Sequence, residues 1–170
     1  MKSTLPKLYI FTDGSVNNQS NIGVGVYWVT TNLNVSIAEV SDHIKYQIFS
    51  QTSSTQLELE CLLWALGELQ HQYQLSQYEL WVYTDSQNII QLPQRREKLQ
   101  QNDFYSSKNK RLKNYQVYQY FYQVIDQYSV QFFKVKGHQA TQKKDKVDLL
   151  FSRVDKAARK IMRSLKKCDK

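Results

Sequence analysis

The order of hydrophobic patterns along this 170-residue chain limits its possible folds more than any other feature. Three runs rich in β-branched and aromatic residues come before the first helix-like pattern, and later strand-like runs alternate with helix-like ones. Three early strands suit an antiparallel meander, whereas strands separated by helices suit parallel additions to the same sheet. The sequence therefore predicts an α/β fold with a mixed five-stranded sheet, antiparallel first and then parallel, and helices on both faces.

The element boundaries are predicted where the hydrophobic periodicity changes. Strands are expected at 7–12, ending in a turn at Asp13, at 22–31, within 34–50, at 78–83 and at 130–135. Helices are expected at 55–70, as a short segment through Ile90, at 115–128 and over most of 144–170. Pro93 is expected to open a polar, basic stretch that runs to Lys113. With no domain boundary in the pattern, 1–170 is expected to form one domain.

Charge is divided unevenly between the two halves of the chain. Residues 1–94 hold three basic and eight acidic residues, a net charge of −5, whereas 95–170 hold twenty basic and seven acidic residues, a net charge of +13. Clustered Lys and Arg bind phosphate backbones by releasing counterions. The basic half therefore favours a nucleic-acid partner over a purely solubilising role, and over a membrane surface.

The sequence also excludes several classes of protein. It has no apolar stretch long enough to span a membrane, and its N-terminus lacks the apolar core of a signal peptide. Cys61 and Cys168 lie far apart, which indicates neither a disulfide framework nor a zinc site. We expect an intracellular, cytoplasmic protein with no membrane partner.

Four acidic residues stand out by their positions. Asp13 and Asp85 follow strand-like runs, whereas Glu58 falls in the first turn of a predicted helix and Asp155 lies within the last one. Each has a local explanation in a turn, a helix dipole or a solvated face. Carboxylates that converge, however, repel one another and need cations to stay ionised. Oxygen ligands of this kind favour Mg²⁺ or Mn²⁺, and two such ions about 4 Å apart are a common device for splitting a phosphodiester.

Several motifs resemble those of the type 1 ribonuclease H family in its bacterial form. They run in the family's order over about residues 8–160, nearly the whole chain. The matching segments are YIFTDGS at 9–15, GVG at 23–25, LEL at 57–59 ahead of Ala65-Leu66, YTDSQ at 83–87, VKGH at 135–138 and VDKAAR at 154–159.

The resemblance implies a ribonuclease H-like fold and a Mg²⁺-dependent endonuclease that cuts the RNA strand of an RNA–DNA hybrid. Two ions are implied, Mn²⁺ being able to substitute, and the products would carry 5′-phosphate and 3′-hydroxyl ends. The positions that match the family's metal-binding acids are Asp13, Glu58, Asp85 and Asp155. His138 matches a histidine on a mobile loop that assists proton transfer or product release.

Two of these assignments have rivals. Glu60 competes with Glu58, which keeps the family's spacing to Ala65-Leu66. Asp148 takes the fourth position if the chain is counted without a gap, whereas Asp155 is followed by Ala158 and Arg159 at the family's offsets. We prefer Glu58 and Asp155, and mutation of Asp148 and Asp155 separately decides the second case.

Substrate recognition is expected from polar side chains near the acids and from a basic protrusion. An RNA–DNA hybrid carries 2′-hydroxyls on one strand only, and polar groups can read them from the minor groove. The polar candidates are Ser15, Asn17, Asn18, Ser54, Thr55 and Gln87, where Ser54 and Thr55 replace asparagines common in the family. Residues 95–113 resemble the family's basic handle in charge, and the candidates there are Arg95, Arg96, Lys98, Lys110 and Arg111.

Two questions stay open at the level of sequence. A non-catalytic module that binds hybrids or duplexes on the same fold is the main alternative to an enzyme. The basic segment at the C-terminus, which includes Arg163, Lys166 and Lys167, either binds substrate or keeps the tail solvated. No obligate protein partner is implied, so a monomer is expected.

Overall fold

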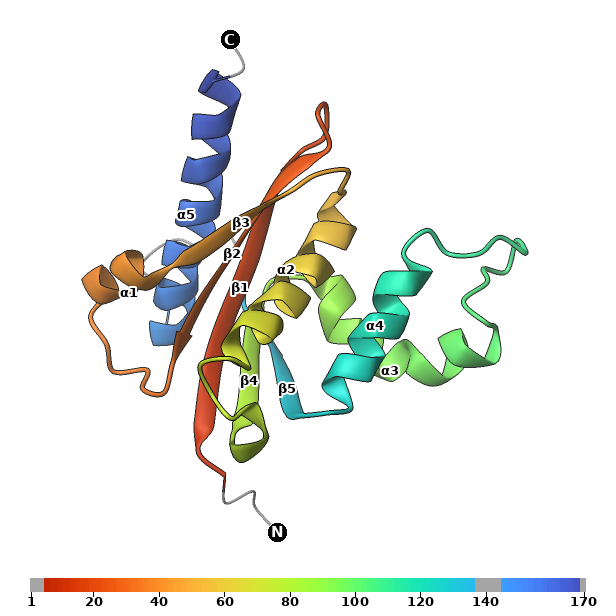
Figure 1. Ribbon diagram of the computed structural model, residues 1–170, viewed down its shortest axis with the longest axis horizontal. Helices are drawn as coiled ribbons and strands as arrows, with labels where there is room; N and C mark the ends of the chain where they lie inside the picture. Colours follow the sequence, from red (N-terminus) through yellow and green to blue (C-terminus); the bar gives the residue numbers. More distant parts are fainter. Residues whose placement is uncertain (1–4, 137–144, 169–170) are drawn as a thin grey trace.

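A mixed five-stranded sheet forms the centre of the molecule (Figure 1). The structure is a computed structural model that describes residues 5–136 and 145–168. The strands are β1 (Lys7–Asn17), β2 (Ile22–Thr30), β3 (Lys45–Phe49), β4 (Glu79–Thr84) and β5 (Ser129–Lys134). Their spatial order is β3-β2-β1-β4-β5; β1 pairs antiparallel with β2 and β2 with β3, whereas β1–β4 and β4–β5 are parallel. The predicted fold class is confirmed.

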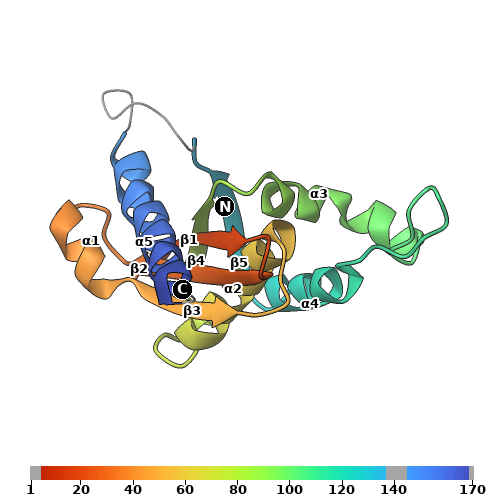
Figure 2. The same cartoon turned by 90° about the horizontal axis from the view of Figure 1, so that it is seen from above.

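Helices cover both faces of this sheet. They are α1 (Ile37–His43), α2 (Ser54–Leu69), the 3₁₀ turn η1 (Leu75–Gln77), α3 (Gln87–Gln101), α4 (Tyr115–Ile125) and α5 (Lys146–Cys168). Helix α2 packs on β1 and β2 and is joined by α3 and α4, whereas α5 covers the other face beside α1 (Figure 2). Within the described ranges, no helix is both long and apolar enough to cross a membrane.

Alternation along β1 divides the interior into two hydrophobic cores. Leu8 and Ile10 join the core beneath α2, α3 and α4, whereas Tyr9 and Phe11 belong to the core beneath α5. Successive side chains of a strand point to opposite faces. The same alternation places Asp13 on the face that α5 covers.

The first strand is longer than predicted, and the expected turn at Asp13 is wrong. Asp13, Gly14 and Ser15 remain paired with β2, and β1 ends at Asn17. A Cβ added at Gly14 would lie 2.8 Å from Cδ2 of Leu57, a buried residue of α2. Gly14 therefore allows α2 to approach the sheet closely, and it is not a turn residue.

The 34–50 segment contains a helix as well as the predicted strand. Ser36 begins α1 with a capping box, in which its hydroxyl accepts from the Glu39 N–H and the Glu39 carboxylate accepts from the Ser36 N–H. These two bonds satisfy N–H groups at the start of the helix. Only Lys45–Phe49 then pairs with β2.

Helix α3 continues through Pro93, contrary to the prediction of a short helix ending at Ile90. A proline inside a helix removes one backbone donor and costs about 3 kcal/mol. Burial of Ile89, Leu92 and Leu99 in the core offsets this cost. The first part of the predicted basic stretch is therefore helical, and the other predicted elements agree with the structure within three residues.

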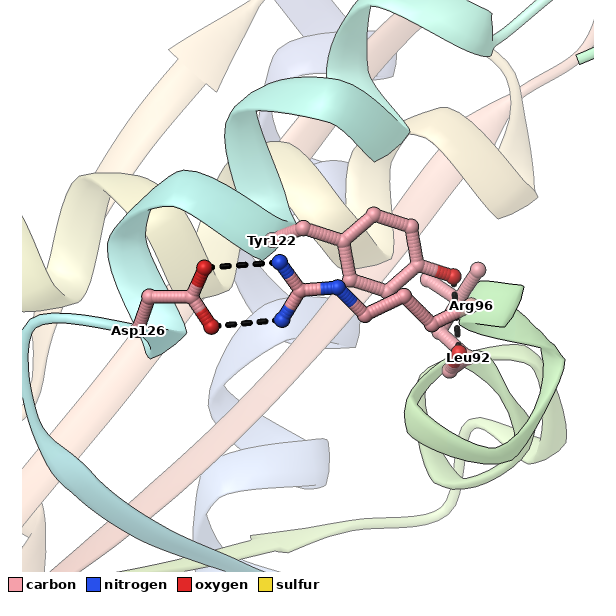
Figure 3. Close-up of polar contacts among 4 residues, drawn as sticks. All are labelled: Leu92, Arg96, Tyr122 and Asp126. Atoms are coloured by element: carbon pink, nitrogen blue, oxygen red, sulfur yellow. Dashed lines mark hydrogen bonds and ion pairs between the residues drawn. The ribbon is translucent and has the colours of Figure 1, made fainter. Parts of the chain in front are cut away.

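A compact set of contacts joins α3 to α4 (Figure 3). The Arg96 guanidinium pairs with the Asp126 carboxylate at 2.5 and 2.7 Å, and it lies 5.1 Å from the ring centroid of Tyr122. The buried Tyr122 hydroxyl donates to the Leu92 carbonyl at 2.7 Å.

Tyr122→Phe is expected to lower the free energy of unfolding by about 1 kcal/mol, because it removes one buried hydrogen bond and keeps the ring. Urea unfolding followed by circular dichroism measures this change. Tyr120→Phe is the matched control, since the Tyr120 side chain is 55% exposed. Equal stability of the Tyr122→Phe variant and the natural chain would contradict the role given to this bond.

Candidate active site

Four elements bring acidic side chains to one end of the parallel strands. Phe11 pairs with Tyr83, so two residues further along the parallel strands Asp13 lies level with Asp85, directly after β4. Asp155 comes from α5, which covers the Asp13 face, and Glu58 comes from α2. Because α2 begins at Ser54, Glu58 lies in the second turn of its helix. The prediction that placed Glu58 in the first turn is wrong.

Asp13 is the acid most affected by this arrangement. Its burial raises the pKa of its carboxyl well above the ordinary value, and the neighbouring carboxylates of Asp85 and Asp155 raise it further. A hydrogen bond from the Gly14 backbone acts in the opposite direction. Asp13 is thus a partly buried carboxyl beside two other acids, an arrangement that a nearby cation would stabilise.

Glu58 is linked to the same cluster through Ser86. Burial raises the pKa of Glu58, the Asp85 charge adds to this effect, and a hydrogen bond from Ser86 lowers it. The Ser86 hydroxyl donates to Glu58 Oε2 and accepts from the Ile89 N–H at 3.3 Å, which makes Ser86 the N-cap of α3. The start of α3 therefore positions the Glu58 carboxylate beside Asp85.

Arg159 holds the fourth acid. One turn after Asp155 on α5, its Nε donates to Asp155 Oδ1 at 2.9 Å and its Nη2 pairs with Oδ2. The hydrogen bond to Asp155 raises the pKa of Arg159, and the charges of Asp155, Asp13 and Asp85 raise it further. A guanidinium therefore lies at the edge of the acidic cluster.

The rival acids have other partners. The Asp148 N–H donates to Asp145 Oδ1 at 2.8 Å, and the Asp145 N–H donates to Asp148 Oδ2 at 3.3 Å. This reciprocal pair caps the start of α5 in the manner of a capping box. Glu60 accepts from Thr52 Oγ1 at 3.0 Å and from Gln56 Nε2 at 2.8 Å, and it lines a different surface hollow with Trp64 and others.

The chemistry of the four acids fits a divalent cation. In the parts of the chain that the structure describes, no three Asp, Glu, His or Cys side chains are already arranged as metal ligands. Two of the four carboxylates are instead held by Arg159 and Ser86. Oxygen donors are nonetheless what Mg²⁺ and Mn²⁺ prefer, and burial together with the charges of Asp85 and Asp155 raises the pKa of Asp13. Asp13, Glu58, Asp85 and Asp155 could hold such an ion.

The predicted polar contacts lie on three segments around these acids. Ser15 and Asn17 belong to the last part of β1, and Asn18 follows in the exposed turn to β2. Ser54 and Thr55 open α2, and Gln87 opens α3. The exposed Lys134, at the end of β5, donates from Nζ to the Gln87 side-chain oxygen. Their role in substrate binding stays a prediction.

The predicted handle consists of the second half of α3 and the loop that leads to α4. Arg95 and Lys98 line a hollow of about 920 Å³ with Asn102 and neighbouring loop residues. Arg111 lies 3.9 Å from the ring centroid of Tyr115, whereas Lys110 is exposed. Arg96, the fifth handle candidate, is already paired with Asp126 (Figure 3).

Three functional candidates emerge only from the structure: Ser86, Lys134 and Arg159. Ser86 and Arg159 stand inside the motifs quoted above, directly after Asp85 and four residues after Asp155, and this placement is the one signal that could have indicated them. Lys134 precedes the VKGH motif. His138, a predicted catalytic residue, lies outside the described residues.

Comparison with known proteins gives one family and a set of similar folds. The sequence model of a family described as RNase H matches residues 6–158. No curated protein sequence matches the chain. Among the similar solved structures is that of the foamy viral protease-reverse transcriptase in complex with dsDNA, with a TM-score of 0.56 and 11% sequence identity. That similarity covers 89% of this chain and 94% of the other, and it concerns the fold alone.

Proposed function

The chain belongs to the RNase H family, and we propose that it is an endoribonuclease that hydrolyses the RNA strand of RNA–DNA hybrids. Membership of the family supports a nuclease of the ribonuclease H type in general. The choice of a hybrid, the cut strand, Mg²⁺ as the cofactor and the 5′-phosphate and 3′-hydroxyl ends are our proposal. So is the organisation of 1–170 as one ribonuclease H-like domain.

The observation that carries the proposal is the shared environment of the four acids at the family's motif positions. The charges of Asp85 and Asp155 both raise the pKa of Asp13, and the charge of Asp85 also raises the pKa of Glu58. Such repulsion between carboxylates is unfavourable in a protein interior, and the perturbed pKa values that it causes are typical of functional sites. The cluster is therefore better explained as a metal site than as four separate structural acids.

The protein side of the reaction follows from these positions. Asp13, Glu58, Asp85 and Asp155 would hold two Mg²⁺ ions, for which Mn²⁺ could substitute. When bound, such ions make water a better nucleophile and stabilise charge on the departing oxygen. Ser86 keeps the Glu58 carboxylate in place, and Arg159 restrains Asp155. Water that attacks phosphorus while the 3′ oxygen departs leaves a 5′-phosphate and a 3′-hydroxyl.

His138 is proposed to assist proton transfer or product release. The segment that leads to it begins beside the acids, because the Val135 N–H donates to the Thr84 carbonyl at 2.9 Å and Asp85 follows Thr84. A histidine can exchange a proton near neutral pH, which suits either role.

The substrate would be held by the polar residues around the acids and by the handle. Gln87 is one candidate, because its side-chain oxygen accepts from Lys134 and its NH₂ group has no hydrogen-bond acceptor among the described residues. Arg95, Lys98 and Lys110 would contact phosphates, since Arg95 and Lys98 line a hollow with the α3–α4 loop and Lys110 is exposed in that loop.

A substrate comparison tests the proposal. One labelled RNA strand is offered alone, paired with RNA and paired with DNA, in buffer that contains Mg²⁺. Cleavage of the hybrid only, ended by EDTA, is the expected result. Binding of the hybrid without any cleavage would reject the enzyme in favour of a non-catalytic hybrid-binding module.

A further inference from the structure

Helix α5 continues beyond the part of the chain that the family accounts for. The family match ends at residue 158, whereas α5 extends to Cys168. Five of its exposed cations follow a spacing of three or four residues, which places them along one side of the helix. We call them the α5 basic stripe: Arg153, Lys156, Lys160, Arg163 and Lys167.

The stripe faces away from the protein interior. The opposite side of α5 carries Phe151, Val154, Ala158 and Met162, all buried against the sheet. No ion pair of the stripe occurs among the described residues, and Asp155, an acid of the same helix, is paired with Arg159. Among the described residues, the cations of the stripe are therefore not held in ion pairs.

The position of α5 connects this charge with the candidate active site. The stripe begins level with Asp155 and, at 1.5 Å rise per residue, extends for about 20 Å. The helix runs beside β2 and ends near the β1–β2 turn (Figure 1). There Lys166, a cation of α5 next to the last residue of the stripe, shares a hollow of about 260 Å³ with Asn17 and Ser20. A cation of α5 thus lies beside Asn17 at the end of β1, and the other predicted substrate contact, Asn18, follows it in the turn.

We propose that the α5 basic stripe binds phosphates of the hybrid beyond the cut site and so lengthens the contact with the substrate. This inference rests on the proposed function. A duplex carries one phosphate per strand for about every 3.4 Å of its axis, so a 20 Å row of cations can follow several of them.

An anionic membrane is a poorer partner for this surface. Helices that lie on membranes bury a bulky apolar face in the lipid. The corresponding face of α5, with Phe151 and Met162, is already buried against β1 and β2. The stripe therefore offers charge without an apolar anchor, which favours a phosphate backbone.

The test compares two variants of the full chain, both carrying Asp85→Asn so that the hybrid is not consumed. The first replaces four stripe residues, K156Q/K160Q/R163Q/K167Q, and the control, K156R/K160R/K167R, retains the charge. Affinity for a hybrid that extends past the end of α5 is measured over a range of salt concentrations. The glutamine variant is expected to bind at least about tenfold more weakly, with a salt slope shallower by about 0.9 for each phosphate that it no longer neutralises.

An unchanged salt slope in a glutamine variant that folds normally, as judged by circular dichroism, would overturn the inference. So would tight binding of vesicles rich in anionic phospholipid that the same substitutions abolish, if hybrid binding is unaffected. With Asp85 restored, the glutamine variant should cleave a hybrid that is too short to reach the stripe, and the rate should equal that of the natural chain. Failure of the natural chain to cut any hybrid would instead reject the proposed function.

Discussion

Asp155→Asn is expected to slow cleavage of the RNA strand of a hybrid by a factor on the order of 10²–10³, whereas Asp148→Asn should cut at nearly the natural rate. The two substitutions are chemically identical and lie on the same helix. The charge of Asp155 raises the pKa of Asp13, whereas the Asp148 carboxylate accepts a hydrogen bond from the Asp145 N–H at the start of α5. Single-turnover cleavage of a labelled hybrid measures the difference.

Asp148→Asn should show its effect in stability. Asn keeps an oxygen that can accept from the Asp145 N–H but loses the negative charge at the start of α5, so the free energy of unfolding should fall by about 0.3–1 kcal/mol, measured by thermal or urea unfolding. Loss of cleavage in Asp148→Asn with full activity in Asp155→Asn would show that the fourth metal ligand is Asp148 and that our assignment is wrong.

Asp13→Asn is expected to abolish cleavage and to make the metal-free protein more stable. Burial and the charges of Asp85 and Asp155 raise the pKa of Asp13 in the folded state. As the pH rises above the ordinary aspartate value, the unfolded chain loses this proton before the folded one does, so the natural chain loses stability. The variant avoids this loss, and we expect a gain of roughly 0.5–2 kcal/mol, the range common for a single stabilising substitution.

Urea unfolding at several pH values in EDTA measures this effect. The advantage of Asp13→Asn should be present near neutral pH and disappear below the ordinary aspartate pKa, where the carboxyl is protonated in both states. Mg²⁺ should then stabilise the natural chain more than the variant, since binding to the folded state raises its stability. A variant that is less stable than the natural chain at neutral pH would contradict the account of a strained acidic cluster.

The fold was predictable because its main elements differ in hydrophobic period. Leu57, Cys61 and Trp64 recur at helical spacing, whereas the buried strand segments are rich in β-branched and aromatic residues. The errors arose where tertiary packing overrides a local signal. Asp13-Gly14 has the composition of a turn, yet Gly14 continues the strand because Leu57 needs the space of its missing side chain. A proline such as Pro93 typically marks the end of a helix, yet the burial of Leu92 before it and Leu99 after it keeps α3 helical.

The acids of the site were predictable, but their partners were not. Asp13 and Asp85 were identified at the ends of predicted strands, and the structure brings them together because β1 pairs with β4. The bond from Ser86 to Glu58 joins residues 28 positions apart, and it depends on where α3 begins. The capping role of Asp148 likewise depends on the first residue of α5, a boundary that periodicity locates only within a few residues.

Cleavage and binding of one labelled hybrid by the natural chain and by Asp85→Asn test the central claim most directly. The charge of Asp85 raises the pKa of both Asp13 and Glu58, so it is central to the cluster. In Mg²⁺, the natural chain should cut the RNA strand, while Asp85→Asn should bind the hybrid but leave the RNA intact. Equal cleavage by both proteins would contradict the assignment of these acids as the active site.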